Sequence, residues 1–179
     1  MLKAGYRLLR SLRPGKYVSS IYGIDTQALW DQGFRAILTD LDNTLTQWNA
    51  PAANPRLTSW LANLRERGFS VCILSNNVRR RVEPFAAQMG VPFISDAGKP
   101  RRKAFREALA TIGAAAGQTV MIGDQLFTDI LGGNRMGMYT VLVRPLHAHE
   151  HAGTRLVRIV ERWLLRGQAP LDEEGRRPE

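Results

Sequence analysis

The sequence contains very little cysteine and no long hydrophobic run. Its 179 residues include one cysteine, Cys72, so an internal disulfide is impossible and a reducing compartment is expected. No stretch approaches the roughly 20 consecutive apolar residues that a membrane-spanning helix needs. We therefore expect a protein that is soluble or peripheral to a membrane, with a length that suits one hydrophobic core rather than two domains.

Lysine is also scarce, although the chain is strongly basic. Only four of its 25 basic residues are lysine, and the formal net charge is +9. A surface this basic favours anionic partners, which include nucleic acid, an acidic protein or an anionic lipid surface.

Residues 1–24 form a basic amphipathic N-terminal segment. Cationic residues interrupt its leucines, which excludes the apolar core of a secretory signal. On a helical wheel, the apolar and the cationic side chains of this segment occupy different faces. The apolar face carries Leu2, Tyr6, Leu9 and Leu12, and the cationic face carries Lys3, Arg7 and Arg10. Packing on the core and binding to a membrane surface both fit this pattern.

Short runs rich in valine and isoleucine alternate with longer amphipathic stretches along residues 25–167. The runs are 36–39, 70–74, 91–94, 119–122 and 140–143, and the amphipathic stretches are 55–67, 78–89, 101–112, 126–135 and 153–166. This alternation predicts an α/β domain in which a parallel five-stranded sheet lies between helices. The polar stretch 168–179 is expected to be a disordered tail.

Four of the expected strands are followed by side chains suited to phosphate or to a hard cation. These are Asp40 and Asp42 after the first strand, Ser75 and Asn76 after the second, Lys99 after the third, and Asp124 and Asp129 after the fourth. Ligands of open parallel sheets bind at the carboxyl ends of the strands, so we expect these side chains to converge. Converging carboxylates need a counter-charge, and Mg²⁺ is the cation that best fits a set of oxygen ligands.

The spacing of these residues predicts phosphoryl-transfer chemistry. A carboxylate such as Asp40, oriented by a metal, is a competent nucleophile toward phosphorus and would give an aspartyl-phosphate. Asp42 lies two residues further on an extended chain and therefore on the same side, where it can act as the general acid and base. Ser75 and Lys99 would hold the phosphoryl oxygens.

These motifs resemble the signature of the haloacid dehalogenase (HAD) superfamily. Asp40-Leu41-Asp42-Asn43-Thr44 is similar to its DxDx[T/V] motif, and the later motifs of the superfamily match Ser75, Lys99 and Gly123-Asp124 with Asp129, in that order. The resemblance implies that Mg²⁺ is bound by Asp40, by Asp124 and by the main-chain carbonyl of Asp42. It also implies that Asp129 stabilises the metal site without binding the metal directly, and that Thr44 orients the turn after the first strand.

The stretches "SNN", "GDQLFTDILGGNRMGMYT" and "SIYGID" narrow the resemblance to the YqeG-type phosphatases of HAD class IIIA. That group includes phosphatidylglycerophosphate phosphatases. The resemblance implies a Rossmann-like three-layer fold with strand order 3-2-1-4-5 and dephosphorylation of phosphatidylglycerophosphate to phosphatidylglycerol.

The spacing between the motifs leaves no room for the cap domain of many HAD enzymes. An uncapped site fits a phosphate that projects from something large. Arginines at the start of two expected helices are predicted to form a basic rim around this site, and these are Arg79, Arg80, Arg81, Arg101 and Arg102. Such a rim would attract an anionic phospholipid surface, so we expect a cytoplasmic enzyme that is peripheral at the inner face of the cell membrane.

Two other functions remain open at this stage. The same chemistry could act on a phosphoprotein or on a nucleic-acid phosphate end, or the chain could be a signalling module that is stably phosphorylated on Asp40. Asp42 favours turnover, because stable phosphorylation does not need an acid at that position. A metal site at His147, His149 and His151 would lack a partner cluster elsewhere in the chain, and a solvated loop is the simpler interpretation.

Overall fold

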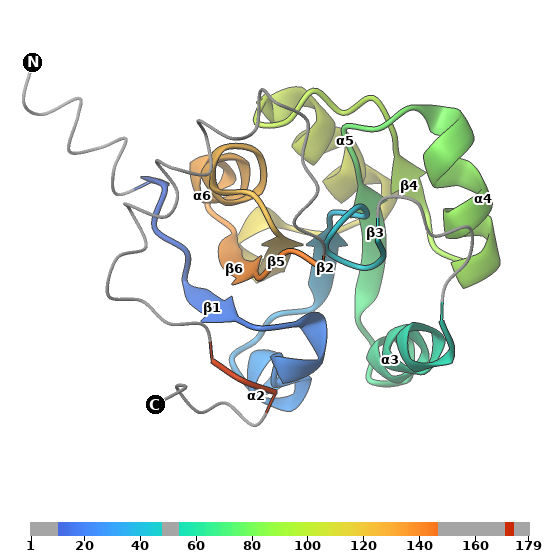
Figure 1. Cartoon of the computed structure of the whole chain (residues 1–179). Coiled ribbons are helices and arrows are strands. Elements are labelled where there is room, and N and C mark those ends of the chain that lie inside the picture. The colour runs from blue at the N-terminus through green and yellow to red at the C-terminus, as the bar shows by residue number, and fades with distance from the viewer. Residues whose placement is uncertain (1–10, 48–53, 147–170, 174–179) are drawn as a thin grey trace, which may run out of the picture.

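The computed structural model describes residues 11–47, 54–146 and 171–173 (Figure 1). Six parallel strands form one sheet in the order β1-β6-β5-β2-β3-β4. They are β1 (Lys16–Val18), β2 (Ala36–Thr39), β3 (Ser70–Leu74), β4 (Phe93–Ile94), β5 (Thr119–Gly123) and β6 (Tyr139–Val143). The α/β class and the relative order of the five expected strands are confirmed.

The sheet has six strands rather than the expected five, because β1 adds to the edge beside β6. Lys16 pairs with Val141 and Val18 with Val143. This strand has only three residues, so it contains no apolar run that would predict it from the sequence. Its pairing partner lies more than a hundred residues away along the chain. Residues 16–24, which the sequence assigns to the N-terminal segment, thus pack against the sheet, where Ile21 and Ile24 are buried.

Helices cover both faces of the sheet. The helices are α2 (Thr26–Asp31), α3 (Pro55–Glu66), α4 (Arg79–Met89), α5 (Arg102–Thr111) and α6 (Leu131–Met136). One face, which carries Ile37, packs against residues of α2, α3 and α4. The opposite face, which carries Leu38, packs against α5. This alternation along β2 follows from the two-residue repeat of a strand, and it explains why these strands are apolar on both faces.

Cys72 lies fully buried in the middle of β3. Burial raises the pKa of its thiol to about 12, so the side chain remains a protonated, small apolar group.

Residues 171–173 lie against the outer edge of the sheet. The N–H of Leu171 donates to the carbonyl of Tyr17 at 2.9 Å, and its carbonyl accepts from the N–H of Ser19 at 2.7 Å. These three residues belong to the stretch expected to be a disordered tail, and the rest of that stretch that follows them lies outside the described residues. The expected helix at 153–166, the three histidines and residues 1–10 also lie outside them. Within the described ranges, no helix is both long and apolar enough to cross a bilayer.

Candidate active site

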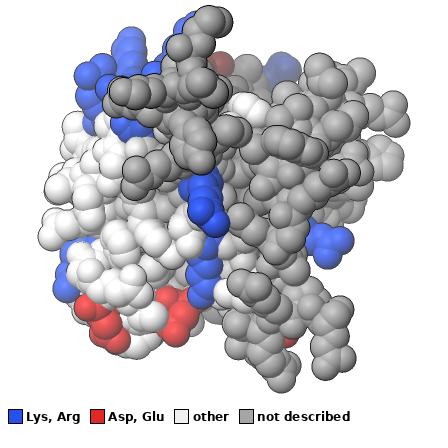
Figure 2. Space-filling view, turned by 90° about the vertical axis from the view of Figure 1, so that its left-hand side faces the viewer, with Lys and Arg blue, Asp and Glu red and all other residues white. Residues whose placement is uncertain are grey.

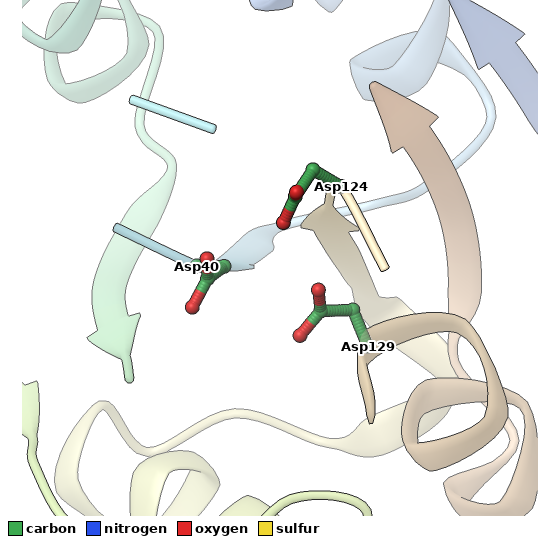
Figure 3. A group of neighbouring side chains, drawn as sticks. All are labelled: Asp40, Asp124 and Asp129. Atoms are coloured by element: carbon green, nitrogen blue, oxygen red, sulfur yellow. The ribbon is translucent and has the colours of Figure 1, made fainter. Parts of the chain in front are cut away.

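Three aspartates meet at the carboxyl ends of the central strands. Asp40 follows β2, Asp124 follows β5, and Asp129 lies in a π-helical turn, Leu126–Ile130, that leads into α6. Figure 3 shows the three side chains next to one another, and each offers a ligand oxygen such that all three atoms lie within 4.8 Å of one another. All three residues are buried. Strand pairing produces this convergence, because β2 lies beside β5 in the sheet.

The Lys99 ammonium lies between two of these carboxylates. Its Nζ is 2.6 Å from Oδ1 of Asp40 and 2.7 Å from Oδ1 of Asp129. Burial alone would lower the pKa of this ammonium, but the charges of Asp129 and Asp40 outweigh burial and raise it above its usual value. Lys99 is therefore a permanent positive charge inside the site.

One ammonium does not neutralise three carboxylates. Burial is the main cause that raises the pKa of Asp40 to about 7, and Lys99 opposes this effect while Asp129 adds to it. With all carboxylates ionised, the group of Asp40, Asp124, Asp129 and Lys99 carries a formal charge of −2. Hard oxygen donors and two uncompensated negative charges fit a divalent cation, and this buried group could bind one.

Asp129 is held by two protein donors. Its Oδ1 accepts from Lys99, and its Oδ2 accepts from the N–H of Gln125 at 3.2 Å. Protein donors thus hold both of its oxygens. This arrangement suits a residue that orients the site more than one that gives an oxygen directly to a metal.

Asp42 points to a different set of partners. Its Oδ1 lies 2.9 Å from Nη2 of Arg81, and its Oδ2 accepts from Nδ2 of Asn77 at 3.1 Å. A tight turn follows Asp42: Asn43 has a positive φ of 63°, its N–H donates to the carbonyl of Thr46 at 2.7 Å, and Thr44 is buried inside the turn. This turn sends the chain away from the strand directly after the two acids.

The expected phosphate-binding residues also lie at this edge. Ser75 is buried at the end of β3, and its Oγ accepts from the N–H of Asn77 at 3.1 Å. The Asn76 side chain has another partner: its Oδ1 accepts from the main-chain N–H of Lys99 at 2.7 Å, next to a cis peptide bond between Lys99 and Pro100. Asn76 therefore fixes the backbone that presents the Lys99 ammonium.

The arginines expected in the rim do not form a single group. Arg81 is turned inward to Asp42, whereas the exposed Arg79 pairs with Glu83 at 2.5 Å. Arg80, Arg101 and Arg102 are exposed, and the latter two lie at the start of α5. On the neighbouring face shown in Figure 2, basic side chains likewise lie in several separate places.

The sequence pattern did not single out Asn77 as a site residue, although it stands in the stretch "SNN" after β3. Asn77 lies before the N-cap of α4, outside the helical repeat, so no local pattern distinguishes it from Asn76.

The chain is similar to known phosphatases. A family model described as HAD-hydrolase-like matches residues 96–151. The "Probable phosphatase YqeG" of Bacillus subtilis is 44% identical over 152 residues, which cover 85% of this chain and 88% of that protein. The "Phosphatidylglycerophosphate phosphatase 1, chloroplastic/mitochondrial" of Arabidopsis thaliana is 29% identical, and the alignment covers 89% of this chain but only 50% of that longer protein.

A similar fold occurs in the cobalt-bound deoxy-D-mannose-octulosonate 8-phosphate phosphatase of Haemophilus influenzae. The two structures superpose with a TM-score of 0.51 at 19% identity, over 76% of this chain and 90% of that one. At this identity the similarity concerns the fold alone.

Proposed function

The chain belongs to the YqeG-type phosphatases of the HAD superfamily, and from this premise we propose that it is a Mg²⁺-dependent phosphomonoesterase that converts phosphatidylglycerophosphate to phosphatidylglycerol. The observation that carries the proposal is the buried group of Asp40, Asp124, Asp129 and Lys99, with Asp42 two residues after Asp40. The named phosphatidylglycerophosphate phosphatase among its relatives supports the choice of substrate.

In the first step, an oxygen of Asp40 attacks the phosphorus atom and the bond between phosphorus and the leaving oxygen breaks. The electron pair of that bond goes to the leaving oxygen, which takes a proton from Asp42. The products of this step are the alcohol and an aspartyl-phosphate on Asp40.

In the second step, water attacks the phosphorus of the aspartyl-phosphate while Asp42 removes a proton from it. Inorganic phosphate leaves, and both aspartates return to their starting state. Throughout, Ser75 and Lys99 would bind the phosphoryl oxygens, and Asn76 keeps the backbone of Lys99 in place.

The metal would be held by Asp40, Asp124 and the main-chain carbonyl of Asp42, while Asp129 orients the group through Lys99 and the N–H of Gln125. When bound, Mg²⁺ supplies positive charge that allows the carboxylate of Asp40 and an anionic phosphate to approach each other.

The proposed location is the cytoplasmic face of an anionic membrane. The chain has a formal charge of +9, and Arg80, Arg101 and Arg102 are exposed near helix starts at the carboxyl edge of the sheet. Each basic residue near such a surface contributes roughly 1 kcal/mol of attraction. Asp42 and the start of α3 at Pro55 are separated only by residues 43–54, which is too short a segment for a cap domain.

The test is phosphate release from phosphatidylglycerophosphate in mixed micelles with Mg²⁺. Parallel assays use sn-glycerol 3-phosphate, a phosphoserine peptide and a 5′-phosphorylated oligonucleotide, and Asp40→Asn is the inactive control. We expect the lipid to be the best substrate by kcat/KM. Preferred hydrolysis of the peptide or the oligonucleotide would replace the lipid with that class, and trapping of a stable phosphoprotein without turnover would favour a signalling role.

A further inference from the structure

Two side chains at the start of α4 converge on the carboxylate of Asp42. Arg81 donates to its Oδ1 from both Nε, at 3.2 Å, and Nη2, at 2.9 Å. Asn77 donates to its Oδ2 from Nδ2, at 3.1 Å. Both oxygens of the expected general acid are therefore held from one helix end, which neither phosphate binding nor metal binding explains.

The donors themselves are fixed by further contacts. The Oδ1 atom of Asn77 accepts from the N–H of Val78 at 2.8 Å, which leaves the amide nitrogen to face Asp42. Nη2 of Arg81 also donates to the carbonyl of Gln47 at 3.3 Å, and so links α4 to the chain after the turn. The side chains of Arg81 and Asp42 are only 19% and 14% exposed. Solvent therefore competes weakly with this pair, and its geometry is better defined than that of a surface ion pair.

We propose that Arg81 and Asn77 are positioning residues that set the orientation of Asp42 for proton transfer. An ionised carboxylate has about four acceptor positions, and the contacts from Arg81 and Asn77 take three of them. The fourth, on Oδ2, is the position from which the proton moves to the leaving oxygen and to which the proton of water returns. This assignment rests on the proposed phosphatase function and reassigns Arg81 from the substrate-attracting rim to the acid–base apparatus.

The neighbouring arginine shows that this orientation is specific. Arg79 begins the same helix turn, but it lies outward, where it pairs with Glu83. If the arginine cluster acted only by attracting anions, loss of Arg79 and loss of Arg81 would have similar consequences. If Arg81 positions Asp42, loss of Arg81 slows proton transfer by Asp42, and loss of Arg79 does not.

Substrates with different leaving groups distinguish these two explanations. An alkyl phosphate has a poor leaving group that needs a proton from Asp42, whereas p-nitrophenolate leaves readily without one. The parameter kcat/KM reports the step that forms the aspartyl-phosphate, so it isolates the protonation step from the later hydrolysis. A defect in positioning Asp42 must therefore be large for alkyl phosphates and small for p-nitrophenyl phosphate.

The experiment compares Arg81→Gln, Arg81→Lys and Asn77→Ala with Arg79→Gln and with Arg106→Gln, an exposed arginine on α5. Asp42→Asn serves as the reference for lost acid catalysis. For Arg81→Gln and Asn77→Ala we expect kcat/KM to fall about 10- to 100-fold for sn-glycerol 3-phosphate and less than about threefold for p-nitrophenyl phosphate. Arg81→Lys should recover part of the loss, and Arg106→Gln should match the unsubstituted protein.

Each outcome is decisive. Retained hydrolysis of p-nitrophenyl phosphate shows that a variant is folded. An equal loss with both substrates, or a loss in Arg79→Gln of the same kind as in Arg81→Gln, overturns the positioning role and leaves the phosphatase function standing. If the unsubstituted protein with Mg²⁺ hydrolyses neither substrate nor the lipid, the proposed function is wrong and this assignment falls with it.

Discussion

The ammonium of Lys99 lies 2.6 Å from the carboxylate of Asp40, and both groups are buried. The same Nζ reaches Asp129 at 2.7 Å. Two carboxylates that would repel each other are thus joined through one cation. The pair of Lys99 and Asp40 therefore has a structural role in addition to any role in phosphate binding, because it reduces the repulsion between the buried carboxylates.

Replacement of Lys99 with methionine should destabilise the metal-free protein. The substitution replaces lysine with an unbranched apolar side chain that is one atom shorter, and it leaves the buried Asp40 and Asp129 without their cation. Such a change typically costs about 3–5 kcal/mol. Denaturant unfolding in EDTA measures this loss. Since a divalent metal replaces part of the missing charge, 10 mM Mg²⁺ should recover some of the stability. If Lys99→Met is as stable as the unsubstituted protein in EDTA, the ammonium does not hold the acids together.

The free energy of unfolding of the metal-free protein should fall as the pH rises from about 4 to about 7. Burial raises the pKa of Asp40 from 3.8 to about 7, so in this window the folded state binds more protons than the unfolded state. Stability is then lost as the pH approaches the folded pKa. The difference between the unsubstituted protein and Asp40→Asn in EDTA isolates this contribution, since asparagine does not titrate. A flat difference across the window would contradict the raised pKa.

Magnesium should raise the melting temperature, and Asp124→Asn should abolish most of that rise. Asp124 is buried, and one of its oxygens lies within 4.8 Å of an oxygen of Asp40. Its substitution removes one oxygen ligand and one negative charge. At a Mg²⁺ concentration 100 times Kd, binding stabilises by about 2.7 kcal/mol, which is roughly 5–10 °C for a chain of this size. Asp25→Asn, at a helix N-cap away from the strand ends, is the control that should keep the full Mg²⁺ response. An undiminished response in Asp124→Asn would place the metal elsewhere.

The convergence of the site could be predicted from the sequence, because it depends on periodic and local signals. The apolar runs at 36–39 and 70–74 coincide with β2 and β3. Parallel pairing then brings the residues that follow these strands to one edge of the sheet. Acids directly after such runs, as at Asp40 and Asp124, are unusual enough to identify the edge that binds a ligand.

The partner of each side chain could not be predicted in the same way. Three consecutive arginines, 79–81, look equivalent in the sequence, yet Arg79 pairs with Glu83 and Arg81 with Asp42, because the helix turns them to different sides. The pairing of β1 with β6 likewise depends on a contact across the whole chain, and a three-residue strand carries too weak a pattern to reveal it.

The contact of Leu171 with β1 should contribute more stability than the ion pair of Glu173. Leu171 is bonded to the backbone of Tyr17 and Ser19 and packs, half-buried, against the core. Leu171→Ala should cost about 1–2 kcal/mol, below the range for a fully buried leucine. Glu173→Gln should cost less than about 1 kcal/mol, because its bond with Arg56 is exposed. Denaturant unfolding of both variants checks the order, and the reverse order would mean that residues 171–173 are held by charge.

Gly123, at the end of β5, has no room for a side chain, because Asp129 fills that space. A methyl group on Gly123 would lie 2.3 Å from Cγ and Oδ2 of Asp129. Asp129 cannot simply turn aside, since Lys99 and the N–H of Gln125 hold its two oxygens. Gly123→Ala should therefore cost about 1–3 kcal/mol of unfolding free energy.

The same substitution should disturb the site, since any movement of Asp129 breaks its contact with Lys99. We expect Gly123→Ala to lose most of its phosphatase activity and to show a smaller rise in melting temperature with Mg²⁺. Gly117→Ala is the matched control, because nothing lies within 4 Å of its added methyl group. It should stay within about 1 kcal/mol of the unsubstituted protein, with a gain expected because alanine restricts the unfolded chain. If Gly123→Ala keeps full activity and the full Mg²⁺ response, the position of Asp129 is not critical, and its proposed role in orienting the metal site is wrong.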